Sequence, residues 1–194
     1  MTEINAETLK KLFDDAREAG VFYPGLYEMM MMAYCCGVKR RELITLKLDD
    51  FIEEIGEETK VKKRFLRCKM PLGSYLEELK KDGELSLELP LFPRYYNRDP
   101  KKIYVDFNKV CLCTLSNRIR YVDIINAGMR DFFAGLPEEE FIMPEHVNGE
   151  MRNFFAAHFS EDAQMDRKYR AVAEQYGYKN IDYVCQVLND NKKE

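Results

Sequence analysis

The chain has 194 residues, of which 46% are hydrophobic and 33% charged, and its formal net charge is −4 at pH 7. These values are ordinary for a soluble globular protein of one domain with a substantial core. The charged N-terminus lacks the apolar core of a signal peptide, and the longest apolar run, residues 26–36, is too short to cross a bilayer. We therefore expect one domain over residues 1–194, a cytoplasmic location and no membrane partner.

Six cysteines and two histidines limit the chemistry that the side chains can perform. The cysteines form no CxxC pair, so we expect reduced, partly buried thiols, no metal site and no cofactor. The acidic balance counts against a protein whose whole surface binds phosphate. A local basic stripe remains compatible with DNA binding.

The N-terminal part of the chain is predicted to be helical. Asn5 caps a first helix, whose apolar face is followed by Gly20. An apolar helix over residues 26–36 then stops at Gly37. A short helix follows over residues 39–46.

The middle of the chain is predicted to contain a small sheet. Residues 51–71 alternate apolar and basic side chains around a turn at Gly56, which is the period of a β-strand. Further along we expect a helix over 74–81, an extended stretch over 85–93, a loop over 93–102 and a strand over 103–113.

The C-terminal part is predicted to be helical again. Helices are expected over residues 114–133, 147–159, 160–176 and 180–188, with Gly177 closing the third. The order of elements is therefore two helices, a small sheet and more helices, so the predicted class is α+β and mainly α.

Four separated segments carry a recognisable pattern. The first segment, residues 33–51 (AYCCGVKRRELITLKLDDF), is predicted to be a helix that ends at a glycine and is followed by Glu-Leu and a later Asp. The second, residues 68–81 (CKMPLGSYLEELKK), is predicted to be a strand that ends in Pro-Leu and leads into a helix. Residues 150–159 (EMRNFFAAHF) carry Arg152, and residues 169–181 (YRAVAEQYGYKNI) read as a helix closed by a glycine turn. In this order, the four segments resemble the catalytic domain of the tyrosine recombinases of the phage integrase family.

The resemblance implies the recombinase catalytic-domain fold, a helical fold with a small antiparallel sheet, here without the family's N-terminal core-binding domain. In that family a tyrosine attacks a DNA phosphate, two arginines bind the phosphate oxygens, a lysine protonates the leaving oxygen and histidines assist. By resemblance, Arg152 is the second arginine and Lys63, with Lys62 nearly as good, is the sheet lysine. Lys39 stands at the first arginine and Tyr178 at a histidine.

At several positions this chain has a residue other than the one that the family has. Lys39 lacks the planar fork of arginine. Gly149 and Asn153 stand where the family has histidines, and Val187 stands where it has the nucleophile. Tyr183 lies one helical turn before that position, about 6 Å along the axis, and in-line attack does not tolerate such an error. The resemblance thus implies a degenerate site and no ordinary recombination.

We predict a catalytically inactive integrase-like protein that binds duplex DNA or acts as an accessory or regulator of DNA recombination in a mobile element. The predicted DNA-binding residues are Lys39, Arg40, Lys62, Lys63, Arg64, Arg67 and Arg152. These cations also fit the solvated face of a helix or strand, which is the simpler interpretation of each residue taken alone.

Two alternatives stay open. The first is a protein-interaction module that kept the fold and lost DNA, and that docks on another recombinase subunit or a second copy through the helix over residues 180–188. The second is an active enzyme with a rewired site, in which Tyr183 or Tyr178 is the nucleophile and His146 the base. His158 is expected to be a packed structural histidine.

Overall fold

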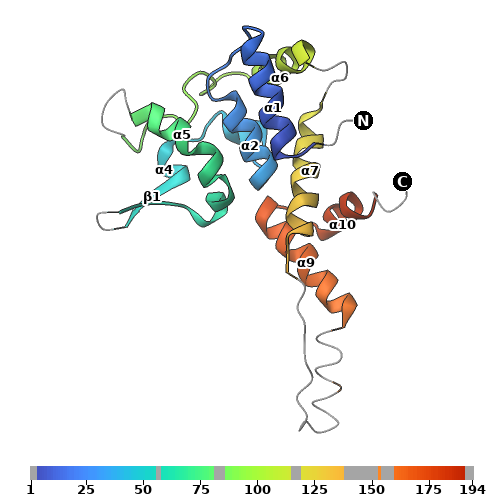
Figure 1. The fold of residues 1–194 in the computed structure, drawn as a ribbon. Coiled ribbons are helices and arrows are strands. Elements are labelled where there is room, and N and C mark those ends of the chain that lie inside the picture. The colour runs from blue at the N-terminus through green and yellow to red at the C-terminus, as the bar shows by residue number, and fades with distance from the viewer. Residues whose placement is uncertain are drawn as a thin grey trace. The chain divides into compact units, whose positions relative to one another are not determined.

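The computed structural model of the protein describes residues 4–55, 58–80, 86–114, 119–137, 153 and 160–190 (Figure 1). This part of the chain is mainly helical, with one two-stranded antiparallel sheet, which confirms the predicted α+β, mainly α class. The chain divides into two compact units, Met1–Gly128 and Met129–Glu194. Each unit is described by itself, and the single domain over residues 1–194 stays a prediction.

The first unit is built around the apolar helix. Helix α2 (Leu26–Cys36) packs against α1 (Ala6–Glu18) and α6 (Lys101–Thr114). Nine of its eleven residues are buried, as expected for a helix that is apolar on all sides. It ends, as predicted, at Gly37, which has the left-handed φ of 63° that favours glycine.

The predicted start of the first helix is confirmed. The Asn5 side chain accepts a hydrogen bond from the Thr8 amide at 2.9 Å, and the Thr8 hydroxyl accepts one from the Asn5 amide at 2.9 Å. This reciprocal pair is a capping box, which satisfies two amides that have no partner inside the helix. The local sequence therefore fixes where α1 begins.

Short elements connect α2 to α6. In chain order they are α3 (Arg40–Leu43), α4 (Leu48–Phe51), β1 (Ile52–Ile55), β2 (Glu58–Val61), the 3-10 helix η1 (Lys63–Cys68) and α5 (Lys69–Lys80). The two strands pair with Ile52 opposite Val61 and Ile55 opposite Glu58. In Figure 1 this hairpin extends from the side of the unit that carries α4 and α5.

The strand predicted through residues 62–71 is wrong beyond Val61. The chain there forms η1 and the start of α5, in which the buried residues Phe65, Cys68, Leu72 and Tyr75 recur every three or four positions. That spacing is helical, and the basic residues between them gave the appearance of alternation. Pro71 lies in the first turn of α5, where its missing amide hydrogen costs nothing.

The strand predicted over residues 103–113 is also wrong, because this segment lies inside α6. The stretch expected to be extended at 85–93 mostly forms turns where it is described, and it joins the chain near α4 through hydrogen bonds from Leu48 to Leu89 and from Leu91 to Leu46, each 2.9 Å long. Residues 46–49 and 87–91 are therefore held side by side by backbone contacts.

The second unit contains the C-terminal helices. Helix α7 (Tyr121–Ala134) crosses the boundary between the units in sequence, and α9 (Glu161–Tyr176) packs against α10 (Ile181–Asn189). Ser160 and Asn180 cap these two helices, and Gly177 ends α9 with a φ of 67°, as predicted. The helix predicted over 147–159 lies outside the described residues, except for Asn153. Nowhere in the described ranges is a helix long and apolar enough to span a bilayer.

Candidate nucleic-acid interface

Six of the seven predicted DNA-binding residues lie in the first unit, on or beside α3 and η1. Lys39 is exposed at the N-cap of α3, and Lys63 and Arg64 are exposed on η1. We call the set the basic cluster; its members are Lys39, Arg40, Lys62, Lys63, Arg64 and Arg67. The seventh residue, Arg152, lies outside the described part of the chain.

Two contacts hold the basic cluster at the C-terminal end of α2. The Arg64 guanidinium forms a two-pronged ion pair with the Glu42 carboxylate, which joins η1 to α3. Arg67 Nη1 donates to the backbone oxygen of Cys35 at 2.9 Å, which joins η1 to the last turn of α2. Because the C-terminal end of a helix carries partial negative charge, a guanidinium is favoured there. The sequence did not predict these contacts, because it placed η1 in a strand.

The charge around the cluster differs from that of the whole chain. Residues 39–69 contain ten of the thirty Lys and Arg residues but seven of the thirty-four Asp and Glu residues. Of those seven acidic residues only Glu42 belongs to α3, and the other six lie within 49–58. The segment that carries the cluster is therefore net positive within a chain of net negative charge.

Two tyrosines that sequence reasoning missed border the cluster. The Arg40 guanidinium carbon lies 5.9 Å from the ring centre of Tyr104 on α6 and 5.6 Å from that of Tyr121 on α7. The Tyr121 hydroxyl also donates to the Val38 backbone oxygen. Cation–π contacts of this kind fix the position of a guanidinium. Reading 103–113 as a helix would have placed Tyr104 on its exposed side.

The family tyrosine positions lie in the second unit, at the turn between α9 and α10. The rings of Tyr178 and Tyr183 are 5.0 Å apart between centres. Burial, followed by the neighbouring Tyr183, raises the pKa of Tyr178 to about 12. Its hydroxyl therefore stays protonated at neutral pH and is a poor base. Val187, at the nucleophile position, is buried in α10.

Only some of the other family positions lie within the described residues. His146, Gly149 and His158 lie outside the described residues, whereas Asn153 is described and exposed. Lys63, predicted as a lysine on the small sheet, lies on η1. The described family positions therefore fall in two separate units, with Lys39 and Lys63 in the first and Tyr178, Tyr183 and Val187 in the second.

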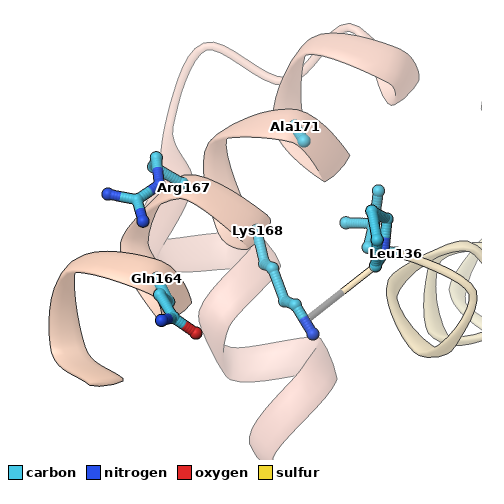
Figure 2. A pocket seen from close by; sticks show the side chains of 6 residues that line it. Leu136, Gln164, Arg167, Lys168 and Ala171 are labelled. Atoms are coloured by element: carbon cyan, nitrogen blue, oxygen red, sulfur yellow. The ribbon is translucent and has the colours of Figure 1, made fainter. Parts of the chain in front are cut away.

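A small pocket lies in the second unit between α9 and the segment that follows α7. Figure 2 shows the residues that line it, among them Leu136 and, on α9, Gln164, Arg167, Lys168 and Ala171. Its volume is about 200 Å³. Because ligand pockets commonly exceed about 300 Å³, we assign it no ligand.

The described side chains contain no group of three or more His, Cys, Asp or Glu residues arranged to hold a metal ion. Comparisons with protein-family models, with curated proteins and with solved structures found no match. The likeness to tyrosine recombinases therefore depends on the four sequence segments. Of these, residues 68–81 lack the strand that the likeness implies, because α5 begins at Lys69.

Proposed function

We propose that this protein is a non-catalytic DNA-binding protein that contacts the phosphate backbone through the basic cluster. On the recombinase-like fold that the sequence resemblance implies, it acts as an accessory or regulator of recombination. One observation carries the proposal: the cations of α3 and η1, which are distant in sequence, are fastened to the same end of α2. Sequence-independent DNA affinity depends on such a local group of cations.

Preorganisation supports phosphate binding. Arg40 contacts two aromatic rings, and Arg67 donates a hydrogen bond to the backbone of α2. Side chains that are already ordered lose less conformational entropy when a phosphate binds. Exposed Lys39 and Lys63 provide point charges beside them.

A non-catalytic role has separate support. The nearest tyrosines to the family nucleophile position are Tyr178 and Tyr183, which pack on each other, and the raised pKa of Tyr178 opposes its activation. Lys39 offers a point charge where the family reaction needs a guanidinium fork. Binding survives these changes, whereas phosphoryl transfer does not.

The binding test compares two double variants of equal charge change. We expect the chain to bind a labelled duplex with an affinity that falls steeply with salt, measured by fluorescence anisotropy. Lys62→Glu/Lys63→Glu should lower the slope of log affinity against log salt by about 2, because two phosphate contacts are lost. Lys109→Glu/Lys179→Glu, which changes exposed lysines outside the cluster, should leave the slope near that of the natural chain. Absence of binding at low salt, or an equal loss in both variants, would refute the proposal.

Catalysis and recombination are tested separately. A nicked suicide duplex should yield no covalent adduct; an adduct that disappears in Tyr183→Phe or Tyr178→Phe would establish the rewired enzyme instead. The accessory role predicts that the chain changes the rate of strand exchange by an active tyrosine recombinase. The cluster variant should lose this effect, and an unchanged rate with the natural chain would remove the recombination part of the proposal.

The interaction module that docks through its C-terminal helix has less support. Val184 and Val187 of α10 are buried within their own unit, and Arg130 Nε donates to the Val187 backbone oxygen at 3.4 Å. The apolar face of α10 is thus covered by the same chain. A helix exchanged between protomers would have to leave these contacts.

A further inference from the structure

Two thiols from distant parts of the first unit meet beneath the basic cluster. Cys36 is the last residue of α2 and Cys68 the last residue of η1, and they are 32 positions apart in sequence. Their sulfur atoms are 3.1 Å apart, and both residues are fully buried. The contact joins the same two elements that the hydrogen bond from Arg67 joins.

We propose that Cys36 and Cys68 form a dithiol that closes to an intramolecular disulfide by exchange with a small-molecule disulfide, and that the bond fastens η1 to α2. The bond itself does not depend on the proposed function. An effect of the bond on DNA affinity does depend on the proposed function, because η1 carries Lys63, Arg64 and Arg67.

The geometry favours this pair of residues. A disulfide needs its sulfur atoms at about 2.05 Å, so they must approach by about 1 Å, a movement within reach of side-chain rotation. The Cys35 thiol also forms a hydrogen bond with the Cys68 thiol. The sulfur–sulfur contact at 3.1 Å is that of Cys36, which we therefore assign as the partner.

The exchange is balanced without a further reactant. One cysteine, as its thiolate, attacks a sulfur of oxidised glutathione, forms a mixed disulfide and releases one glutathione thiolate. The second cysteine then attacks the protein sulfur of the mixed disulfide and releases the second glutathione. Two protein thiols are oxidised, one glutathione disulfide is reduced to two thiols, and the two protons pass to solvent or to the leaving thiolates.

The surroundings set the rate of closure. Hydrogen bonds with the neighbouring thiols of Cys35 and Cys36, together with burial, raise the pKa of Cys68 strongly. Little thiolate is then present in the closed structure, and the thiolate is the attacking species. Closure therefore proceeds when η1 opens locally or while the chain folds, and it accelerates under mild denaturation.

The test uses the full chain in glutathione buffers and approaches equilibrium from both sides. Folded, reduced protein is incubated with oxidised glutathione, and reduced, unfolded protein is refolded in the same buffer. Thiols are then blocked, and peptides are mapped by mass spectrometry. We expect both routes to give a Cys36–Cys68 disulfide and a mass lower by two hydrogen atoms. A chain that stays reduced by both routes, or a bond that maps to Cys35, would overturn the assignment.

Variants separate the bond from its consequence. Cys36→Ser and Cys68→Ser should each lose the disulfide, whereas Cys111→Ser, a buried control on α6, should keep it. The disulfide is mapped first in the natural chain, so the assignment can still be tested if one of these variants fails to fold. Oxidised and reduced natural chain are then compared for duplex affinity. If the bond forms but neither state binds DNA, the proposed function fails and the disulfide stands.

Discussion

The two units use their helices differently. Helix α2 of the first unit buries nine of its eleven residues and holds the basic cluster at its C-terminal end, whereas α10 of the second unit buries Val184 and Val187 and leaves Asp182 and Gln186 in solvent. The first unit thus places cations on a backbone fixed by a core helix. The second unit places its phenols, Tyr178 and Tyr183, against each other. The proposed DNA-binding role depends on the first arrangement, and the absence of catalysis that we propose agrees with the second.

The largest expected effect tests the difference between the helices. Met30 is fully buried in α2, so Met30→Ala should lower the free energy of unfolding by about 2–5 kcal/mol through lost contacts and the cavity left behind. Val184→Ala in α10 removes less buried apolar volume and should cost about 2 kcal/mol. Urea unfolding followed by circular dichroism measures both. A larger loss in the α10 variant would contradict the assignment of α2 as the principal core helix.

The next effect is the stability gained from the proposed disulfide between α2 and η1. A Cys36–Cys68 bond closes a loop of 32 positions, and such a constraint on the unfolded chain should raise the free energy of unfolding by about 3–4 kcal/mol. Urea midpoints of the oxidised chain, with and without dithiothreitol, report the gain. Cys36→Ser should show no dependence on the reductant. A lower midpoint in the oxidised state would mean that the bond distorts the contact between η1 and α2.

A smaller effect concerns the acidic residue inside the cluster. Glu42→Gln removes the negative charge opposite Arg64, so duplex affinity should rise several-fold, by about 1 kcal/mol. Stability should change by less than about 1 kcal/mol, because the Arg64–Glu42 pair is partly exposed. Anisotropy titrations at fixed salt measure the first quantity, and Glu7→Gln on α1 is the control for net charge. Equal gains in both variants would show that charge acts over the whole chain and not through the cluster.

Local signals predicted the helix ends. The cap residues Asn5, Ser160 and Asn180 and the glycines Gly37 and Gly177 act within one turn of the chain, so their effect can be read from neighbouring residues. Of the candidate site, the sequence named the six cations of the basic cluster together with Arg152, and their binding to DNA stays a prediction. It did not predict the contacts with Glu42, Cys35 and Tyr104, since these join distant segments.

A buried carboxylate explains the error over residues 103–113. Asp106 is 2% exposed, and with Ile103, Phe107, Val110 and Cys111 it completes a helical spacing. Because aspartate is charged, the sequence alone places Asp106 on the exposed side. The apolar residues around it then fit the two-residue period of a strand. Its burial is possible because the Tyr95 hydroxyl donates to it at 3.1 Å and Arg94 and Lys102 pair with it. Partners supplied by the tertiary structure cannot be inferred from the period of one segment.

The smallest expected effect lies on α2 itself, at Glu28, its only acidic residue, which is half-buried. Burial, with a contribution from Glu78, raises the pKa of Glu28, while its backbone hydrogen bond and Arg17 oppose the rise. Between its ordinary and raised pKa the folded chain holds more proton than the unfolded chain, so stability falls as pH rises through that interval. Glu28→Gln should therefore raise the melting temperature slightly at pH 7, and the gain should vanish below about pH 4, where glutamate is protonated in both states. A gain of equal size at both pH values would instead indicate improved packing, and a loss at both would show that the carboxylate stabilises α2 through its hydrogen bond.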